Sequence, residues 1–349
     1  MASRLTNVAI STRKAVRYGI YFVILFFIAR ASLGLIGNIY RAVFPPPPPP
    51  PTVAFDRLPS LPFPEKNDFP AFEYKIETPS GSIPTFENQA KVYFMPKAGV
   101  TLTTVEDALR KAKGFGFINP PEEISPTMYR FVHQESSAVM EMNIINGTFS
   151  VSYNLATDPR PLEKQPPTPE AGVSTAKAFL SAGSSNAPDL SGPSTHEFLK
   201  VDSQGLSSVP SLSEGNLIKV NLFRKDIDKL PAKTPDPKTS NVWFIISGDV
   251  RGVRQIVASE YHFFPIDETQ LSTYPIKTTA EALEDLKSGK SYIASLGENQ
   301  DGKVTIRRIY LAYYDAGQYT EFYQPIFVFE GDRSFVAYVP AVTTEYYGN

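Results

Sequence analysis

Three histidines, His133, His196 and His262, are the residues of this chain best suited to bind a metal or to transfer a proton at neutral pH. None has a histidine partner at the spacing of a metal site, and neither an HExxH pattern nor an aspartate-rich calcium loop is present. Glu260 and His262 are alternate residues of one expected strand and therefore share a face. Aromatic residues surround this pair, so we interpret it as the solvated face of a sheet. We predict no metal site and no cofactor.

Gly289-Lys290-Ser291 has the ending of a phosphate-binding loop, but Glu284 stands where that loop needs its first glycine. The tripeptide also follows an expected helix, whereas a phosphate loop precedes one, so we interpret Gly289 as a helix C-cap. The chain has no GxSxG elbow. It has no cysteine either, which excludes thiol nucleophiles, disulfides and thiolate zinc sites. We predict no catalytic residues and no enzymatic activity.

Aromatic residues gather near the carboxyl end of the chain. The run IFVF at 326–329 indicates a strand that is buried on both faces. The preceding loop, DAGQYTEFYQ at 315–324, is harder to bury completely. Tyr319, Phe322 and Tyr323 in this loop are the candidate partner-binding residues, because aromatic side chains are enriched at interfaces. We favour packing of the aromatic residues in the core, and these three are the residues that we name if the chain has a contact surface here.

The charge of the chain is divided unevenly along its length. The first 41 residues contain six basic and no acidic residues, which leaves 28 of the 34 basic residues and all 36 acidic ones for the rest, a net charge of −8. An acidic body without a lysine or arginine cluster lacks the phosphate-neutralising surface that nucleic-acid binding requires. We therefore predict no nucleic-acid partner.

Residues 18–40 carry no charge apart from Arg30. As a helix these 23 residues extend about 34 Å, enough to cross a bilayer core of about 30 Å. Arg30 costs about 2.5–3.5 kcal/mol near mid-span unless its side chain reaches a headgroup. Basic residues in segment 1–17 precede the span, whereas Arg41 alone closely follows it, so we predict a cytoplasmic amino terminus and an extracytoplasmic carboxyl-terminal part.

Seven consecutive prolines, residues 45–51, follow the predicted span. In polyproline II they extend about 22 Å, so we interpret the proline-rich segment 41–72 as a spacer that holds a folded body away from the lipid. A low-complexity linker is the alternative. Ala29-Arg30-Ala31 also has the small-x-small form of a signal-peptidase site, and cleavage after Ala31 would release a secreted protein.

Beyond the spacer, three capped helices are each followed by predicted strands. Thr103 with Glu106 and Thr278 with Glu281 have capping-box spacing. The second helix is expected at 174–182. Asn146-Gly147 predicts a hairpin, which explains Asn146-Gly147-Thr148 better than glycosylation does. The strands are expected at 128–132, at 137–144 and 148–155 around the hairpin, near 195–201, 216–224, 241–247 and 253–263, and at 303–314, 323–330 and 334–342.

Helix-then-meander units predict an α+β fold with antiparallel sheets. We predict a smaller domain at 73–157, a proline-rich linker at 158–169, and a larger domain at 170–349 with two helix-meander repeats. The last unit, TTAEALEDLKSGKSYIAS followed by TIRRIYLAYYD, QPIFVFEG and SFVAYVPAV, resembles PepSY-type domains.

The tandem arrangement behind one span is similar to the YycH and YycI type of bacterial membrane-anchored regulators of sensor kinases. That resemblance implies an extracytoplasmic regulatory protein of the cell envelope that acts through protein contacts. Its partners would be the lipid bilayer, through residues 18–40, and another envelope or membrane protein. A cell-envelope hydrolase that uses unidentified carboxylates is the alternative function.

Overall fold

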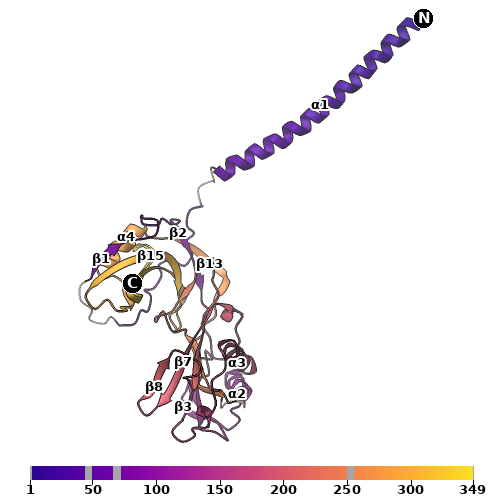
Figure 1. Ribbon diagram of the computed structural model, residues 1–349. Coiled ribbons are helices and arrows are strands. Elements are labelled where there is room, and N and C mark those ends of the chain that lie inside the picture. Colours follow the sequence, from indigo (N-terminus) through magenta and orange to yellow (C-terminus); the bar gives the residue numbers. More distant parts are fainter. Residues whose placement is uncertain (1, 44–48, 66–71, 250–254, 349) are drawn as a thin grey trace. The chain divides into compact units, whose positions relative to one another are not determined.

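The computed structural model describes residues 2–43, 49–65, 72–249 and 255–348, and within the first helix it describes side chains for residues 13–33. The chain divides into two compact units, residues 1–50 and 51–349, and each is described by itself. The first unit contains the helix α1 (Ala2–Val43) (Figure 1). The described side chains of this helix are all exposed. The second unit contains both helices and sheets, as predicted.

A nine-stranded antiparallel sheet forms one part of the second unit. Its strand order is β3-β4-β5-β6-β12-β11-β9-β7-β8. In β6 the buried apolar residues Phe149, Val151 and Tyr153 lie on one face and two serines on the other. In chain order the strands are β3 (Glu122–Ser125), β4 (Met128–Val132), β5 (Ala138–Asn143), β6 (Phe149–Tyr153), β7 (Ser194–Asp202), β8 (Gly205–Val209), β9 (Leu217–Leu222), β11 (Val242–Ile246) and β12 (Ile256–Tyr261).

Two helices, α2 (Thr104–Gly114) and α3 (Pro169–Ala182), cover the same face of this sheet (Figure 1). Their carboxyl-terminal ends meet where the rings of Phe115 and Phe179 stack at 4.6 Å. Gly183 is required at this contact, because a Cβ there would lie 2.1 Å from the Phe115 ring. Short 3-10 turns, η1 (Arg160–Leu162) and η2 (Pro188–Ser191), flank α3 in the chain.

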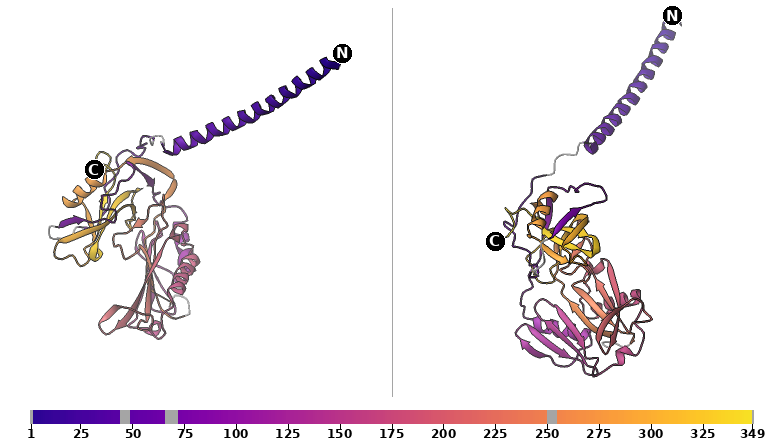
Figure 2. Two further views of the ribbon diagram at one scale, coloured as in Figure 1. Left: turned by 45° about the horizontal axis from the view of Figure 1, so that its top comes forward. Right: turned by 60° about the vertical axis from the view of Figure 1, so that its left-hand side comes forward.

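The expected boundary at 158–169 does not separate two sheets. β6 lies before it and β12 after it, yet the two strands pair with each other, with Phe149 opposite Tyr261. The right-hand view of Figure 2 shows the magenta strands that precede the boundary beside the pink and orange strands that follow it. Strands from both expected domains, β3 to β6 before the boundary and β7, β8, β9, β11 and β12 after it, therefore share one sheet, because β6 pairs with β12.

A six-stranded sheet contains the carboxyl-terminal strands, in the order β1-β15-β17-β18-β14 with β10 beside β15. A three-stranded sheet, β13-β2-β16, lies in the same unit. Their strands are β1 (Glu73–Ile76), β2 (Gln89–Phe94), β10 (Ala232–Lys233), β13 (Asp267–Pro275), β14 (Tyr292–Ser295), β15 (Lys303–Tyr314), β16 (Phe322–Tyr323), β17 (Pro325–Gly331) and β18 (Val336–Pro340), with the 3-10 turn η4 (Asp332–Ser334) before β18.

Strand β17 is buried on both faces, as its apolar run predicted. Phe327 and Phe329 face the helix α4 (Thr279–Lys287) and pack with its Leu283 and Leu286. Ile326 and Val328 point to the opposite side, because successive side chains of a strand alternate. There they pack with Leu61, which comes from the segment that follows the prolines.

That segment, residues 52–63, is called the strap below. The Val53 N–H donates to the Thr273 carbonyl at 3.0 Å, and the Leu58 N–H donates to the Tyr346 carbonyl at 2.8 Å. Leu58 is fully buried. We expected the segment 41–72 to be a spacer and the folded structure to begin at residue 73. The strap is instead part of the folded unit, because its backbone hydrogen bonds are made with β13 and the carboxyl-terminal segment.

The spacer prediction for 41–72 falls partly outside the described residues, since 44–48 and 66–71 are not described. Residues 49–51 have no regular secondary structure.

One of the two predicted capping boxes is present. The Thr278 hydroxyl accepts from the Glu281 N–H at 3.2 Å, and the Glu281 carboxylate accepts from the Thr278 N–H at 2.7 Å. At α2, however, Thr103 makes no capping hydrogen bond, and its hydroxyl donates to Asp107 at 3.0 Å. The α3 helix begins at Pro169, earlier than predicted, because Thr168 caps it and proline suits the first helical position.

Candidate functional site

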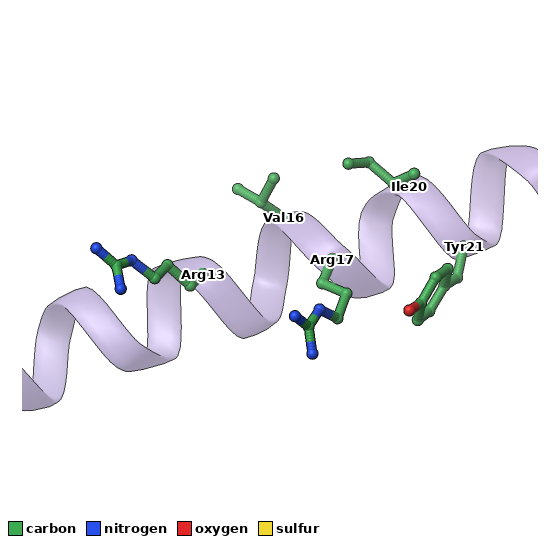
Figure 3. A pocket seen from close by; sticks show the side chains of 5 residues that line it. All are labelled: Arg13, Val16, Arg17, Ile20 and Tyr21. Atoms are coloured by element: carbon green, nitrogen blue, oxygen red, sulfur yellow. The ribbon is translucent and has the colours of Figure 1, made fainter.

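One helical segment in the described part of the chain, Arg13–Leu33 within α1, has the length and composition to cross a membrane. A signal sequence near an amino terminus passes the same test, so cleavage after Ala31 stays a prediction. Figure 3 shows the guanidinium groups of Arg13 and Arg17 directed towards the amino-terminal end, with Tyr21 one turn after Arg17. Basic and aromatic residues at the start of an apolar run are typical of a membrane interface.

Tyr319, Phe322 and Tyr323, the candidate contact residues, do not form an exposed aromatic patch. Phe322 and Tyr323 make up β16 and are 7% and 1% exposed, so the favoured interpretation of core packing holds for both. Phe322 stacks on Phe55 of the strap, and Tyr323 stacks on Tyr313, each at 4.9 Å between ring centroids. The physical reason is that β16 pairs with β2, a strand that the sequence analysis did not predict.

Tyr319 is half-buried and lines a cavity of about 410 Å³, here called the Tyr319 cavity. Its size lies within the range of about 300–1,000 Å³ that is usual for ligand pockets. Four separate segments form the lining: the residues after β2, the turn between β5 and β6, the connection from β12 to β13, and the loop before β16. The lining residues are Pro96, Lys97, Ala98, Asn143, Ile145, Asn146, Phe264, Pro265 and Tyr319.

The β5–β6 turn is held by its own side-chain amides. The Asn143 carbonyl Oδ1 accepts from the Ile145 N–H at 3.0 Å and the Asn146 N–H at 3.2 Å. Asn146 Oδ1 accepts from both the N–H and the hydroxyl of Thr148, at 3.0 and 2.9 Å. Gly147 has a φ of +73°, which the predicted Asn-Gly hairpin requires. The hairpin is therefore confirmed, with a loop longer than two residues between β5 and β6.

A buried arginine fixes another wall of the cavity. Arg224 is 3% exposed, and its Nε donates to the Asp315 carboxylate at 2.8 Å. Its Nη2 donates to the carbonyl of Phe264, whose ring contacts that of Tyr319 at 6.3 Å. Burial alone would lower the pKa of this guanidinium, but the interactions with Asp315, Tyr323 and Asp189 together outweigh it and the net pKa is raised.

The histidines and the glycine singled out in the sequence have roles in local structure. His262 Nε2 lies 2.8 Å from the Glu260 carboxylate on a partly exposed face, in agreement with the solvated-sheet interpretation. The His133 ring Nδ1 lies 2.9 Å from the Ser136 hydroxyl. Gly289 follows α4 with a φ of +74° and ends that helix, as the C-cap interpretation predicted. Among the described residues, no group of three metal-ligating side chains is present.

In the described part of the chain, each carboxyl group whose pKa is clearly shifted has a lowered pKa. Arg160 and Tyr153 hydrogen-bond to Asp158 and hold its pKa well below the usual range. Arg307 likewise lowers the pKa of Asp332 through a hydrogen bond. A general acid needs a raised pKa near neutral pH, whereas a lowered pKa is the mark of an ion pair. These groups give the hydrolase alternative no candidate residue, and it stays a prediction.

A second, more open hollow of about 640 Å³ lies beside α4 and is called the α4 hollow. Its lining mixes carboxylates with ammonium groups. Lys277, which is 9% exposed, pairs with Asp285 at 2.9 Å. The lining residues are Ile83, Lys277, Ala280, Glu281, Leu283, Glu284, Asp285, Lys287, Thr343 and Thr344.

No family model and no curated protein matches this chain. Among solved structures, the chain is similar to an uncharacterized protein from Eubacterium rectale, with 12% sequence identity and a TM-score of 0.38. The match covers 74% of this chain and 79% of that protein.

Proposed function

We propose that the chain is a membrane-tethered, extracytoplasmic binding protein whose second unit contacts another envelope or membrane protein through the Tyr319 cavity. The observation that carries the proposal is that an exposed apolar helix is followed closely in the chain by the strap, which is hydrogen-bonded to the rest of the folded unit. The predicted cytoplasmic amino terminus and extracytoplasmic body are part of this proposal.

The tether rests on the short connection between the two units. Residues 44–51 separate the end of α1 at Val43 from Thr52, whose N–H donates to the Thr273 hydroxyl at 2.9 Å. Eight residues reach at most about 28 Å. A protein with so short a connector stays near the membrane in which its helix is inserted, which suits contact with a membrane partner.

The binding role rests on the character of the Tyr319 cavity. Its lining is mostly apolar and aromatic, with a few polar groups, which is the usual composition of a ligand site. It also lies where segments of the nine-stranded and the three-stranded sheets meet, and such junctions are common positions for binding sites.

The resemblance to PepSY-type repeats stays part of the proposal. Each of α2, α3 and α4 precedes a set of strands in the chain, and we propose that these are three related helix-meander units. A regulatory role through protein contacts is what the resemblance implies.

Site-specific photo-crosslinking in intact cells tests the contact. Tyr319 is replaced by p-benzoylphenylalanine, and the matched control carries the same group at Ala280, which is exposed in the α4 hollow. We expect an adduct with an envelope or membrane protein from position 319 and none from position 280. The same adducts from both positions, or adducts from position 280 alone, would contradict the assignment of the contact to the Tyr319 cavity.

A further inference from the structure

The polar side chains of the Tyr319 cavity other than Tyr319 share one property, because the hydrogen-bonding groups that they leave unused are donors. The amide oxygens of Asn143 and Asn146 are already used within the turn, as described above. Their Nδ2 groups have no hydrogen-bond partner within the described ranges. Each therefore retains N–H groups for a ligand.

The third donor is the ammonium group of Lys97. Lys97 is exposed, and the described part of the chain provides it with no ion-pair partner. The Tyr319 hydroxyl adds no further free donor, since it donates to the Met95 carbonyl at 3.3 Å. Among the residues that the structure describes, no acidic side chain lines the cavity. The electrostatic character of the site is therefore positive.

The remaining lining is apolar and comes from Pro96, Ala98, Ile145, Phe264 and Pro265, together with the Tyr319 ring. Apolar walls favour an apolar ligand group, and the free donors favour an acceptor that carries negative charge. The α4 hollow differs in this respect, because Glu281, Glu284 and Asp285 contribute negative charge to its lining.

We infer that the Tyr319 cavity binds the carboxyl terminus of a peptide chain whose last residue is apolar. The apolar side chain lies against Phe264 and Tyr319, and the terminal carboxylate accepts from Lys97 and the two asparagine amides. This inference rests on the proposed function, because it assigns a ligand class to the proposed contact site.

Three small peptides separate the contributions to binding. N-acetyl-Ala-Phe carries both groups, N-acetyl-Ala-Phe-amide lacks the charge, and N-acetyl-Ala-Ser lacks the apolar side chain. Saturation-transfer NMR titrations with the full chain in lipid nanodiscs give their affinities. We expect the free acid to bind about five-fold more tightly than either of the others, since about five-fold corresponds to roughly 1 kcal/mol.

Variants locate the binding. Lys97→Gln is expected to remove the difference between acid and amide, whereas Lys113→Gln, which changes another exposed lysine, leaves it unchanged. Ala98→Phe places a ring in the cavity from an exposed position and is expected to block all three peptides. Circular dichroism shows that each variant is folded.

Two results would overturn the inference. If the acid and the amide bound equally and Ala98→Phe blocked both, recognition of the terminal carboxylate would be refuted, although the cavity would still be a binding site. If saturation were transferred from the protein to none of the three peptides, the ligand class would be refuted. The crosslinking from position 319 tests the proposed function independently.

Discussion

Replacement of Arg224 by methionine is expected to destabilise the second unit strongly, because Arg224 is the buried partner of two carboxylates. Its guanidinium lies 2.8 Å from Asp315 and 3.5 Å from Asp189, and its side chain is 1% exposed. Methionine keeps much of the volume but leaves Asp315 without the Arg224 cation, whereas Asp189 retains Lys225 at 3.7 Å. Removal of one partner from a buried ion pair costs about 3–5 kcal/mol.

Arg308→Met is the matched control. Arg308 pairs with Glu330 at 3.2 Å, but its side chain is 68% exposed. Exposed pairs contribute about 0.2–1 kcal/mol because water screens them. A further comparison uses Asp315→Asn. We expect the double variant Arg224→Met/Asp315→Asn to lose about 1–3 kcal/mol less stability than the sum of the two single losses, as for residues in one network.

The assay is urea unfolding of the full chain in detergent, followed by fluorescence. Trp243 is the single tryptophan of the chain and lies in β11, so its emission reports on the second unit. Equal losses in the free energy of unfolding for Arg224→Met and Arg308→Met, each below about 1 kcal/mol, would contradict this prediction. They would show that the buried ion pairs of Arg224 do not stabilise the wall of the Tyr319 cavity.

Three further predictions use the same unfolding assay. Thr278→Ala should cost about 1 kcal/mol by removing the α4 cap, whereas Thr103→Ala, at a helix start without a capping bond, should cost far less; equal effects would count against the capping geometry. Leu58→Ala, at a fully buried strap residue, should cost about 2–5 kcal/mol, and Leu206→Ala, 53% exposed, should cost little; a near-neutral Leu58→Ala would show that the strap is not part of the folded unit. Asp158 has a lowered pKa, so its contribution is present above about pH 3.9 and is lost as the pH falls towards the folded pKa. The gap in stability between the wild-type protein and Asp158→Asn should therefore narrow on acidification from about pH 5 to about pH 3, and a gap that stays constant would contradict this ion pair.

Elements with a strong local pattern were predicted closely. The expected strands at 128–132 and 303–314 coincide with β4 and β15, and the α4 cap is formed by the residues that its sequence pattern indicates. Alternation, apolar runs and capping are properties of neighbouring residues, so a single sequence displays them.

Pairings between distant residues were not predicted. β2 and β13 lie about 180 residues apart in the chain and pair with each other, which leaves no local signature of their register. This pairing brings β16 beside β2 and buries Phe322 and Tyr323. The apolar character of these residues was visible in the sequence, but what covers them was not.

The Tyr319 cavity also combines local features that were predicted with a long-range proximity that was not. The sequence marked Tyr319 as a contact residue and Asn146-Gly147 as a turn, each for a local reason. Nothing in either stretch indicates that they line one cavity with Phe264. That proximity depends on the way the sheets pack and on the buried Arg224, for which sequence reasoning found no signal.

The most direct test of the proposed tether is the labelling of single cysteines in intact cells, because the natural chain contains no cysteine. Lys238→Cys places a thiol at an exposed position of the second unit, and Ser3→Cys places one before the apolar segment. With a maleimide that cannot cross membranes, we expect position 238 to be labelled in intact cells and position 3 to be labelled after permeabilisation, with both proteins in the membrane fraction. Labelling of position 3 and protection of position 238 in intact cells would contradict a membrane-tethered extracytoplasmic protein.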